Sequence, residues 1–585
     1  MAETDPYLTA TSTSIAATRR WVVAALVASA VYLSYRVVFT VSGAPLDVAL
    51  LLLAAEGLAV AVFGLRAAGA WHAPAELVEV PDAPLPSTTV VVDAAGADPD
   101  ALRTTLVSCR QLRGLERIVV ADPAASTQLR TVADRFGATT VDDVATTVAA
   151  QTSAMWVLLV RAGDLPLPDA LELLAAACSS PDAGIIQLGV EEANPSSFEH
   201  DPTGRWSLTP FDHQVVRPSL AATGSIPWYG DVPAMVRPAA IRDADDTGAS
   251  TIDLGLHALS IGYRVTMVPR TLARLRGART LDESVRQRFD RTAELRRRAR
   301  GRLGDVSASV RRPIRLALAD PLAAVRWVLL VFVAVLVLSL GRLPMNASLV
   351  PLALLAAPAY GLRWRARSLL GRGRFGRVSV LRSELRSVGV DLAFGHGLGE
   401  RSARNHVLLL GAMVVAVGLA VAIGAAAVWR DGADRMPAGA AAASLALSAG
   451  FLIVAADVLF DVAARRQRRG NHRVRLDGVG CRLDDHPGRL HDLSTGGCGL
   501  IVSEDVGRLR SGDEVTVQFR IPDAGGAWRD VATTVRVAHV GPPVDGERRI
   551  GAAFADPTGA SLDPVIEFLT IDRRLVALGR LATAS

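Results

Sequence analysis

The sequence predicts a multi-domain protein: an α-helical membrane bundle of about six spans, an inserted cytoplasmic α/β domain and a C-terminal antiparallel β-barrel. Half of the 585 residues are hydrophobic, and many of them gather in long apolar runs. Residues 85–272 alternate strand-like runs with helical patterns, whereas residues 470–575 carry short β-type runs separated by turn residues. A chain of this length is too long for one core, so we expect two to four domains.

Six segments are apolar over enough residues to cross a bilayer, which takes about 20 residues at the rise of an α-helix. They are 21–40, 47–69, 324–341, 347–363, 406–429 and 437–461. Arginines flank the first, fourth and sixth segments. Because cytoplasmic loops carry an excess of arginine and lysine, this distribution predicts that the N-terminus, residues 72–323, residues 364–405 and the C-terminal tail lie in the cytoplasm. Arg36 interrupts the first segment and is expected to reach toward an interface.

The charged residues, the cysteines and the start of the chain limit the kinds of site that the sequence can form. The formal net charge is +5, and every Lys or Arg position is an arginine, so each permanent cation is a planar donor of several hydrogen bonds. The four cysteines have no C-x-x-C spacing, which predicts buried thiols rather than a disulfide framework or a zinc site. The polar start of the chain precedes a long apolar run, so no cleaved signal peptide is predicted. We expect no DNA or RNA partner.

Three strand-like runs in the cytoplasmic region each precede a helical pattern. These pairs are "TTVVVDA" with "DPDALRTTLVSCRQL", "ERIVVAD" with "STQLRTVADRFG", and "AMWVLLV" with "LPDALELLAAA". Regular alternation of this kind predicts an α/β domain on a mostly parallel sheet. Residues 364–405 are rich in arginine and partly amphipathic, which predicts a segment lying on the membrane surface.

The tail contains several short runs with the residues that strands prefer. They are "HRVRL", "GCGLIV", "DEVTVQFRI", "TTVRVAHV" and "RIGAAFA", and the helical pattern "DPVIEFLTIDRRLVAL" follows them. Short strands at this spacing, separated by turn residues, predict a small antiparallel barrel that is closed by a helix.

Two short motifs stand at the start of this tail. "RRGNHRV" and the D-x-S-x-x-G of "DLSTGGCGL" supply Arg468, Arg469, Arg473, Asp492, Ser494 and Gly497. Arg465 and Arg469 also satisfy R-x-x-x-R, so a second register stays open. In this order, and within a barrel pattern, the motifs resemble the two-part signature of PilZ domains over roughly residues 463–575. The alternatives are a basic flank of a membrane span and a simple β-turn.

The resemblance implies that the barrel binds cyclic di-GMP as a regulatory ligand. Guanine presents O6 and N7 acceptors that one guanidinium can meet with two hydrogen bonds, and phosphates favour arginine forks as well. Asp492 and Ser494 are expected to meet base or backbone atoms, and Gly497 to permit a close turn.

The layout of the whole chain resembles the bacterial cellulose synthase catalytic subunit and its family-2 glycosyltransferase relatives. The resemblance divides the chain into two spans at 1–71, a GT-A-like glycosyltransferase domain at 72–323, four spans at 324–462 and a PilZ domain at 463–585. It implies a multi-pass protein of the bacterial cytoplasmic (inner) membrane with its soluble domains in the cytoplasm.

The catalytic motifs of that family are degenerate here. The second strand ends in a pair of aspartates in the family, and only Asp122 remains. The metal-binding D-x-D positions read Arg161, Ala and Gly, and Asp164 follows out of register. The residues around Asp253 are at most a degenerate T-E-D, the motif that carries the general base. The acceptor-binding Q-x-x-R-W has no match.

Three functional hypotheses remain. The favoured one is a membrane-embedded cyclic di-GMP receptor whose glycosyltransferase-like body is catalytically silent and which regulates exopolysaccharide synthesis or a membrane partner, such as an active synthase. The second is a divergent processive glycosyltransferase under cyclic di-GMP control. It would make a β-linked exopolysaccharide from a UDP-sugar with Mg²⁺, using Asp122, Asp164 and Asp253. The third is a structural membrane protein whose barrel has lost its ligand.

Overall fold

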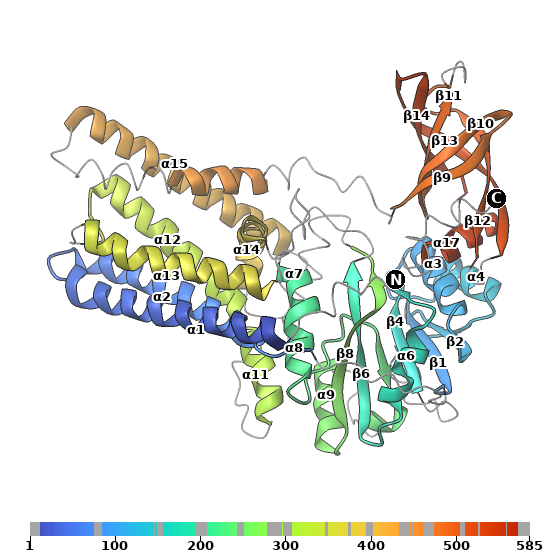
Figure 1. Cartoon of the computed structure of the whole chain (residues 1–585), viewed down its shortest axis with the longest axis horizontal. Coiled ribbons are helices and arrows are strands. Elements are labelled where there is room, and N and C mark those ends of the chain that lie inside the picture. Colours follow the sequence, from blue (N-terminus) through green and yellow to red (C-terminus); the bar gives the residue numbers. More distant parts are fainter. Residues whose placement is uncertain are drawn as a thin grey trace.

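The structure is a computed structural model with three parts: a bundle of long helices, an α/β domain and a β-barrel (Figure 1). It describes residues 12–74, 85–144, 147–148, 156–192, 208–242, 251–277, 283, 295–296, 307–345, 349–371, 376–392, 402–431, 445, 448–459, 473–503, 509–523, 527–556 and 559–570. The barrel stands over the end of the α/β domain that is remote from the bundle.

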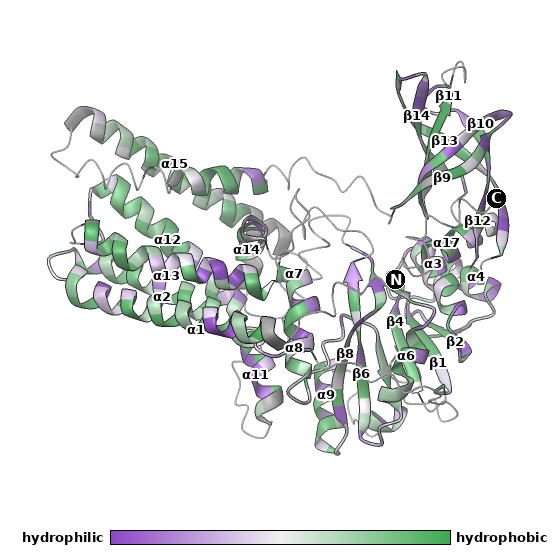
Figure 2. Ribbon diagram, viewed as in Figure 1, coloured by the Kyte–Doolittle hydropathy of each residue, from purple (hydrophilic) through white to green (hydrophobic). Residues whose placement is uncertain are grey.

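The described part of the bundle consists mainly of long helices. These are α1 (Ser12–Tyr35), which continues as the π-helical η1 (Arg36–Thr40), α2 (Leu46–Gly69), α12 (Ala319–Leu340), α13 (Leu349–Leu370), α14 (Arg377–Leu392) and α15 (Ser402–Asp431). Four described helices are long and apolar enough to cross a membrane, judged by length and composition: Ile15–Thr40, Leu46–Gly69, Val310–Leu340 and Leu408–Ala427. Hydrophobic residues predominate along these helices (Figure 2).

These four helices correspond to the first, second, third and fifth predicted segments, and six spans are not shown. The fourth segment forms α13, a helix of 22 residues that contains Pro358 and carries arginines between positions 363 and 367. Because of these charges, α13 is less apolar than the four candidate spans. The sixth segment, 437–461, is described only in part, chiefly as the short apolar helix Ser448–Leu459.

Arg36 lies inside the bundle. Its side chain is fully buried, and its Nη2 is 3.7 Å from Oε2 of Glu56, whose Oε1 accepts a hydrogen bond from the Tyr32 hydroxyl at 2.7 Å. The expectation that Arg36 reaches toward an interface is therefore wrong. An ionised side chain within an apolar span costs less free energy when it faces the bundle interior and an opposite charge.

The described part of the arginine-rich segment 364–405 includes the end of α13, the helix α14 and the start of α15. Its first residues end α13, and α14 runs across the direction of the long helices, so that it is seen end-on in Figure 1. Glu384 of α14 is buried and accepts hydrogen bonds from Arg66 at 2.6 Å, Arg326 at 2.7 Å and Trp327 at 2.9 Å. α14 thus buries charged side chains against α2 and α12. The expectation that segment 364–405 lies on the membrane surface stays a prediction.

The α/β domain contains an eight-stranded sheet in the order β3-β2-β1-β4-β7-β6-β8-β5. Its strands are β1 (Thr88–Asp93), β2 (Leu115–Ala121), β3 (Thr139–Val141), β4 (Trp156–Arg161), β5 (Leu165–Pro166), β6 (Ala183–Glu192), β7 (Ala234–Val236) and β8 (Arg264–Leu275). β1 is parallel to β2 and β4, and β6 is parallel to β8, whereas β7 runs antiparallel between β4 and β6. The predicted α/β domain with a mostly parallel sheet is confirmed.

The three predicted strand–helix pairs are also confirmed. β1, β2 and β4 are followed by α3 (Pro99–Arg110), α4 (Thr127–Arg135) and α6 (Ala170–Cys178). Asp98 caps α3, because its side chain accepts a hydrogen bond from the Ala101 amide, and Ser126 caps α4 in the same way. Buried residues such as Val92 and Trp156 form the core between sheet and helices.

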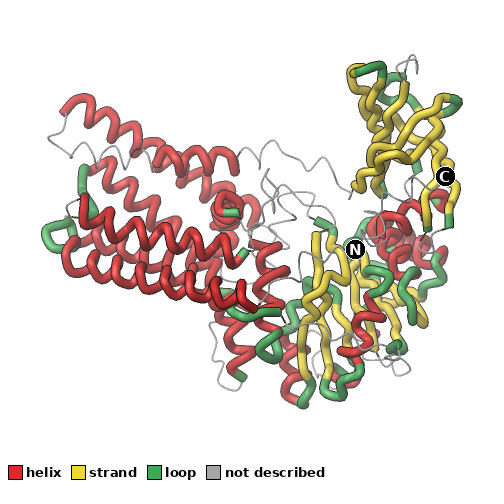
Figure 3. Tube along the Cα trace, in the orientation of Figure 1, coloured by secondary structure: helices red, strands yellow, loops and turns green. Residues whose placement is uncertain are grey.

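The tail forms a closed barrel in the order β10-β11-β14-β13-β12-β9, as predicted (Figure 3). Its elements are β9 (Arg473–Leu483), β10 (His486–Ser494), β11 (Gly497–Ser503), β12 (Glu514–Pro522), β13 (Trp528–Val544), β14 (Glu547–Phe554) and the helix α17 (Asp563–Thr570). Alternate residues of each strand, such as Val515, Val517 and Phe519, fill its interior. All four cysteines are buried and free.

α17 joins the barrel to the α/β domain and lies beside α3 (Figure 1). Oδ1 of Asp563 is 2.7 Å from Nη2 of Arg103 in α3, and Oδ2 is 2.9 Å from Nη2 of Arg135 in α4. Arg103 is only 2% exposed and also donates to the carbonyl of Gly559 at 2.7 Å. Ile566 packs in the core of the α/β domain, whereas its neighbours in α17 pack in the barrel core.

Candidate functional site

Asp492 and Ser494 lie on the outer face of the barrel, near the tight turn between β10 and β11. Leu493 between them is fully buried in the barrel core, so the alternation of a strand directs its two neighbours outward. Both are nevertheless buried, at 8% and 2% exposure. The Ser494 hydroxyl donates to the carbonyl of Gly497 at 2.8 Å, which closes the turn.

Gly497 is required by a close backbone approach. A Cβ atom at this position would lie 2.2 Å from the carbonyl oxygen of Ala552 and 3.0 Å from Cα of Ala553 in β14. Any side chain would therefore separate β11 from β14. The structure brings the three residues of the predicted D-x-S-x-x-G motif together on one hairpin.

The predicted arginines are described only at one position. Arg473 is the first residue of β9, and its backbone pairs with Ser494 in the antiparallel ladder between β9 and β10. The chain thus enters the barrel directly beside the motif. Arg465, Arg468 and Arg469 lie outside the described residues.

Arg549 is a residue at this face that sequence reasoning missed. Its Nη2 is 3.5 Å from Oδ2 of Asp492, and its side chain is 60% exposed. Arg549 is in β14, far from both motifs in sequence. The available signal was the alternation of "RRIGAAF", which puts Arg549 and Gly551 on the face opposite the apolar Ile550 and Ala552.

The second candidate site is the edge of the sheet where the parallel strands end. Ligands of open α/β sheets bind outside the carboxyl ends of the strands. Asp93 and Arg161, the last residues of β1 and β4, are paired in register, and Arg161 is exposed at this edge. Asp122 directly follows β2, the other neighbour of β1.

Asp122 serves the turn between β2 and α4. Its carboxylate is 2% exposed and accepts hydrogen bonds from the amides of Ala124 at 3.1 Å and Ser126 at 2.6 Å. These bonds fix the start of α4, a role that side-chain oxygens of aspartate commonly have in turns. The carboxylate is thus committed to local structure.

Asp164 is buried just behind Arg161. Its Oδ2 accepts a hydrogen bond from the Arg161 amide at 3.2 Å. Burial raises the pKa of Asp164 to about 7, against the opposing effect of the Arg161 guanidinium, and the nearby carboxylates of Asp231 and Asp93 raise it further. At neutral pH this side chain is therefore divided between its neutral and ionised forms.

Asp231, which the sequence reasoning did not single out, is a carboxylate near Asp164. It accepts two hydrogen bonds from Arg217, at 2.7 and 2.8 Å, and its Oδ2 is 3.3 Å from Nε2 of His213. Burial alone would raise the pKa of Asp231, but Arg217 and His213 hold it well below its usual range. Asp253, the third predicted carboxylate, lies half-buried in the first turn of α9 (Thr251–Ser260).

This edge does not fit a magnesium ion. Mg²⁺ needs oxygen ligands in near-octahedral geometry, usually including one or two ionised carboxylates. The described residues of the edge instead present an exposed arginine, a carboxyl with a pKa near 7, the carboxylate of Asp93, which accepts a hydrogen bond from the Ala95 amide, and a carboxylate bound to Arg217. Within the described ranges, no group of three or more His, Cys, Asp or Glu side chains is placed to hold a metal ion.

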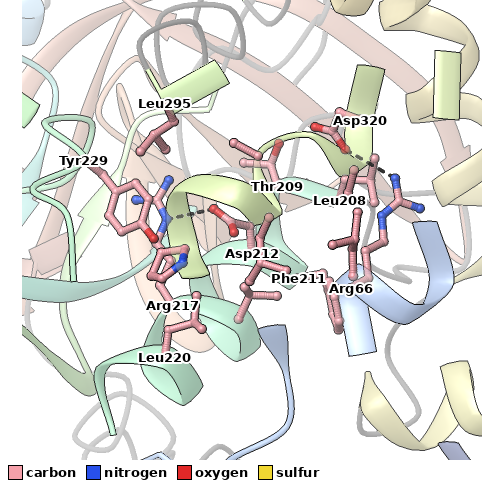
Figure 4. Close-up of a pocket in the computed structure, with 16 residues that line it drawn as sticks. Arg66, Leu208, Thr209, Phe211, Asp212, Arg217, Leu220, Tyr229, Leu295 and Asp320 are labelled. Atoms are coloured by element: carbon pink, nitrogen blue, oxygen red, sulfur yellow. Dashed lines mark hydrogen bonds and ion pairs between the residues drawn. The ribbon is translucent and has the colours of Figure 1, made fainter. Parts of the chain in front are cut away.

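A cavity of about 110 Å³ lies where the bundle meets the α/β domain (Figure 4). Its wall includes residues of α2, α7 (Leu208–Phe211), η2 (Asp212–Val216), α8 (Arg217–Ala221) and α11 (Ala308–Leu316). Arg66 is 3.3 Å from Asp320, Arg217 is 2.7 Å from Asp212, and the Arg217 guanidinium lies 3.9 Å from the ring centre of Tyr229. The charges that line the cavity are thus paired within its own wall.

Comparisons with known proteins support the PilZ resemblance of the C-terminal tail, and they give only distant similarities for the rest of the chain. The model of the PilZ domain matches residues 467–570. No curated protein matches the chain. A mannosyltransferase from Pyrobaculum calidifontis, solved with GDP-Man and Mn²⁺, is 13% identical with a TM-score of 0.34, over 70% of this chain and 99% of that one.

Two further solved structures are similar over shorter parts. Glucosyl-3-phosphoglycerate synthase from Mycobacterium tuberculosis is 13% identical with a TM-score of 0.25, over 36% of this chain and 78% of that one. The inhibitor of motility from Bacillus subtilis is 18% identical with a TM-score of 0.17, over 19% of this chain and 53% of that one. These distant likenesses carry no argument about activity. The match and the closed barrel together identify residues 467–570 as a PilZ domain.

Proposed function

We propose that the chain is a membrane-embedded receptor for cyclic di-GMP whose glycosyltransferase-like body is catalytically silent. It would regulate exopolysaccharide synthesis or a membrane partner, such as a polysaccharide synthase. The single observation that carries the proposal is the PilZ match, with Asp492, Ser494 and Gly497 gathered on one hairpin beside the entry of the chain at Arg473. Arg468, Arg469 and Arg473 would close over the ligand, and Arg465 with Arg469 is the alternative register.

The proposed setting is the bacterial cytoplasmic membrane. Six spans would cross it, at 1–71 and 324–462, with the GT-A-like domain (72–323) and the PilZ domain (463–585) in the cytoplasm. Support comes from the four apolar helices and from the position of the barrel beside the α/β domain.

Silence of the body is supported by the sheet edge. Asp122 is bound to backbone amides, Asp231 is bound to Arg217, and Arg161 is exposed where the family has a metal-binding carboxylate. A divalent metal and the diphosphate of a UDP-sugar would both meet a changed set of groups there.

One observation favours the second candidate, an active divergent glycosyltransferase. The pKa of Asp164 is about 7, and a general base works best when its pKa lies near the operating pH. Such an enzyme would depend on Asp164, with Asp122 and Asp253 as the other surviving carboxylates.

The test is a calorimetric titration of cyclic di-GMP into the full chain in detergent micelles. We expect saturable binding that Arg469→Ala and Arg473→Ala each weaken by at least about tenfold, because each removes a charge-assisted bond to the ligand. Arg536→Ala is the matched control, since that arginine pairs with Glu514 on the barrel surface. If the unmodified protein gives no binding heat with cyclic di-GMP, the proposal of a cyclic di-GMP receptor is rejected.

A second assay separates the two candidates. The same preparation is incubated with UDP-sugars, with and without cyclic di-GMP, and released UDP is measured. The silent body predicts no turnover above buffer. Turnover that Asp164→Asn abolishes would instead establish the divergent enzyme.

A further inference from the structure

The outer face of the barrel carries a row of cross-strand neighbours that includes Asp492. Asp492 in β10 pairs with Gly499 in β11, Gly499 pairs with Gly551 in β14, and Gly551 pairs with His539 in β13. Neighbouring strands lie about 4.8 Å apart. Between Asp492 and His539, β11 and β14 each contribute a glycine to this row, so the surface of the row there is formed by backbone and is flat.

Gly499 allows the Asp492 carboxylate to lie over β11. A Cβ atom at this glycine would be 2.7 Å from Oδ2 and 2.9 Å from Oδ1 of Asp492. At Gly551, by contrast, a Cβ atom would meet only Cβ of His539, at 3.8 Å, which is an ordinary contact. The position of Gly551 is thus open on its outer side.

Arg549 reaches across this flat surface. It is in β14, and its guanidinium contacts Asp492 in β10, so the side chain passes over β11, which lies between the two strands. The Arg549 side chain is 60% exposed, and its guanidinium is 3.5 Å from the largely buried carboxylate, which is longer than an ordinary charge-assisted hydrogen bond. It can turn toward a ligand at small cost.

We propose that Arg549 is a further ligand-reading arginine, which recognises a guanine base of the dinucleotide together with Asp492. The inference rests on the proposed cyclic di-GMP receptor and adds to it the residue that determines which base is accepted. The base would lie flat over Gly551, with Asp492 and Arg549 at its rim.

The chemistry of guanine matches this pair. Guanine has acceptors at O6 and N7 and a donor at its 2-amino group, whereas adenine has an amino donor in place of O6. The Arg549 fork donates, and so it suits O6 and N7, while the Asp492 carboxylate accepts from the amino edge. An adenine base would place its amino group against Arg549 and leave a donor facing a donor.

The experiment compares cyclic di-GMP with cyclic di-AMP by calorimetry on the full chain in detergent micelles. The variants are Arg549→Ala, Arg549→Lys, which keeps the charge but loses the planar fork, and the control Arg536→Ala. Arg536 is the matched control because it is 64% exposed on β13 and pairs with Glu514 at 2.9 Å. Melting temperatures are recorded for every variant.

We expect Arg549→Ala to weaken cyclic di-GMP binding on the order of 10- to 100-fold and to reduce the preference over cyclic di-AMP by about the same factor. Arg549→Lys should recover part of the affinity but little of the preference, because an ammonium is not a bidentate fork. Arg536→Ala should match the unmodified protein.

Two negative outcomes are distinguishable. If the unmodified chain does not bind cyclic di-GMP, the proposed function fails. If it binds and Arg549→Ala binds with the affinity and preference of Arg536→Ala, only the role of Arg549 is overturned.

The flat floor is tested separately by Gly551→Val. The Cβ atom of a residue at this position meets only Cβ of His539, at 3.8 Å, and valine is favoured in strands, so we expect the melting temperature to stay near that of the unmodified protein. Its branched side chain would stand where the base is proposed to lie, and affinity should fall at least about tenfold. Unchanged affinity in a folded Gly551→Val variant would exclude a base on this floor.

Discussion

At the scale of single residues, Asp164 links burial to pH. Its folded-state pKa of about 7 lies above the value of about 3.9 for an unfolded aspartate. Between these values the folded chain holds a proton that the unfolded chain has lost, so stability decreases as pH rises from about 4 to 7. The buried Asp164 carboxyl therefore lowers the free energy of unfolding most above pH 7, where it is ionised in the folded protein.

We expect the free energy of unfolding of Asp164→Asn, relative to that of the unmodified protein, to be higher at pH 8 than at pH 5. The advantage should grow on the order of 2 kcal/mol between these two pH values, because asparagine never ionises. Melting temperatures across pH 4 to 8 measure it, with Asp530→Asn as the control, since the Asp530 side chain is 83% exposed. An advantage that does not vary with pH would contradict an elevated pKa.

Gly497→Ala should destabilise the barrel by about 2 kcal/mol or more. The added methyl group would collide with the carbonyl of Ala552, and relief requires β11 and β14 to separate. Gly480→Ala is the matched control, because a Cβ atom there meets nothing within 4 Å. Thermal unfolding followed by the fluorescence of Trp528 and the other tryptophans compares the two, and equal melting temperatures would refute the close approach.

Residues that local spacing defines were predictable, and residues that long-range contacts define were not. Asp492, Ser494 and Gly497 share one hairpin, so their spacing in the sequence was enough to predict them as a group. Arg549 joins them only through the pairing of β11 with β14. Asp231 joins the sheet edge because β7 is inserted antiparallel between β4 and β6, and no local pattern predicts that insertion.

At the scale of elements, the regular strands and helices were predicted and the irregular ones were not. β10 reads "HPGRLHDLS", in which proline, glycine and histidine break the apolar alternation that identifies a strand. The amphipathic pattern of α14 does not show that its Glu384 pairs with Arg66 of α2 and Arg326 of α12. The hydropathy of a sequence does not predict which charged side chains form buried ion pairs between helices.

α17 gives a prediction at this scale. Asp563→Ala removes the carboxylate that pairs with Arg103, and a buried charge left without its partner typically costs about 3–5 kcal/mol. We expect amide hydrogen exchange in α17 and α3 to accelerate by at least about tenfold. Glu547→Ala, which breaks the exposed pair with Arg489, should leave these helices unchanged, and equal exchange in both variants would disprove the anchoring role.

At the scale of the whole molecule, the barrel contacts the α/β domain through α17. The helix contacts α3, and the cap of α3 at Asp98 is bound by Arg276, which follows β8 at the carboxyl edge of the sheet. A change in the barrel therefore has a short, packed route to the sheet edge. The contact between α17 and α3 could not be predicted from the sequence, because the residue pattern of each domain does not indicate which surface of the other domain it contacts.

Saturating cyclic di-GMP should alter amide exchange in α3 as well as in the barrel. Arg103→Ala should confine the change to the barrel, because Arg103 carries the ion pair and the bond to Gly559. Hydrogen exchange with mass spectrometry on the full chain measures both. A ligand effect in α3 that survives Arg103→Ala would show that another route carries it.

The placement of α17 also constrains how this sequence can evolve. One short helix completes two hydrophobic cores, with Ile566 in one and Val565, Phe568 and Leu569 in the other. A recombination event that exchanged the barrel for a homologous one would also replace part of the neighbouring domain's interior. We therefore expect that a substitution on α17 is tolerated in both domains only when α3 and the barrel interior can accommodate it together.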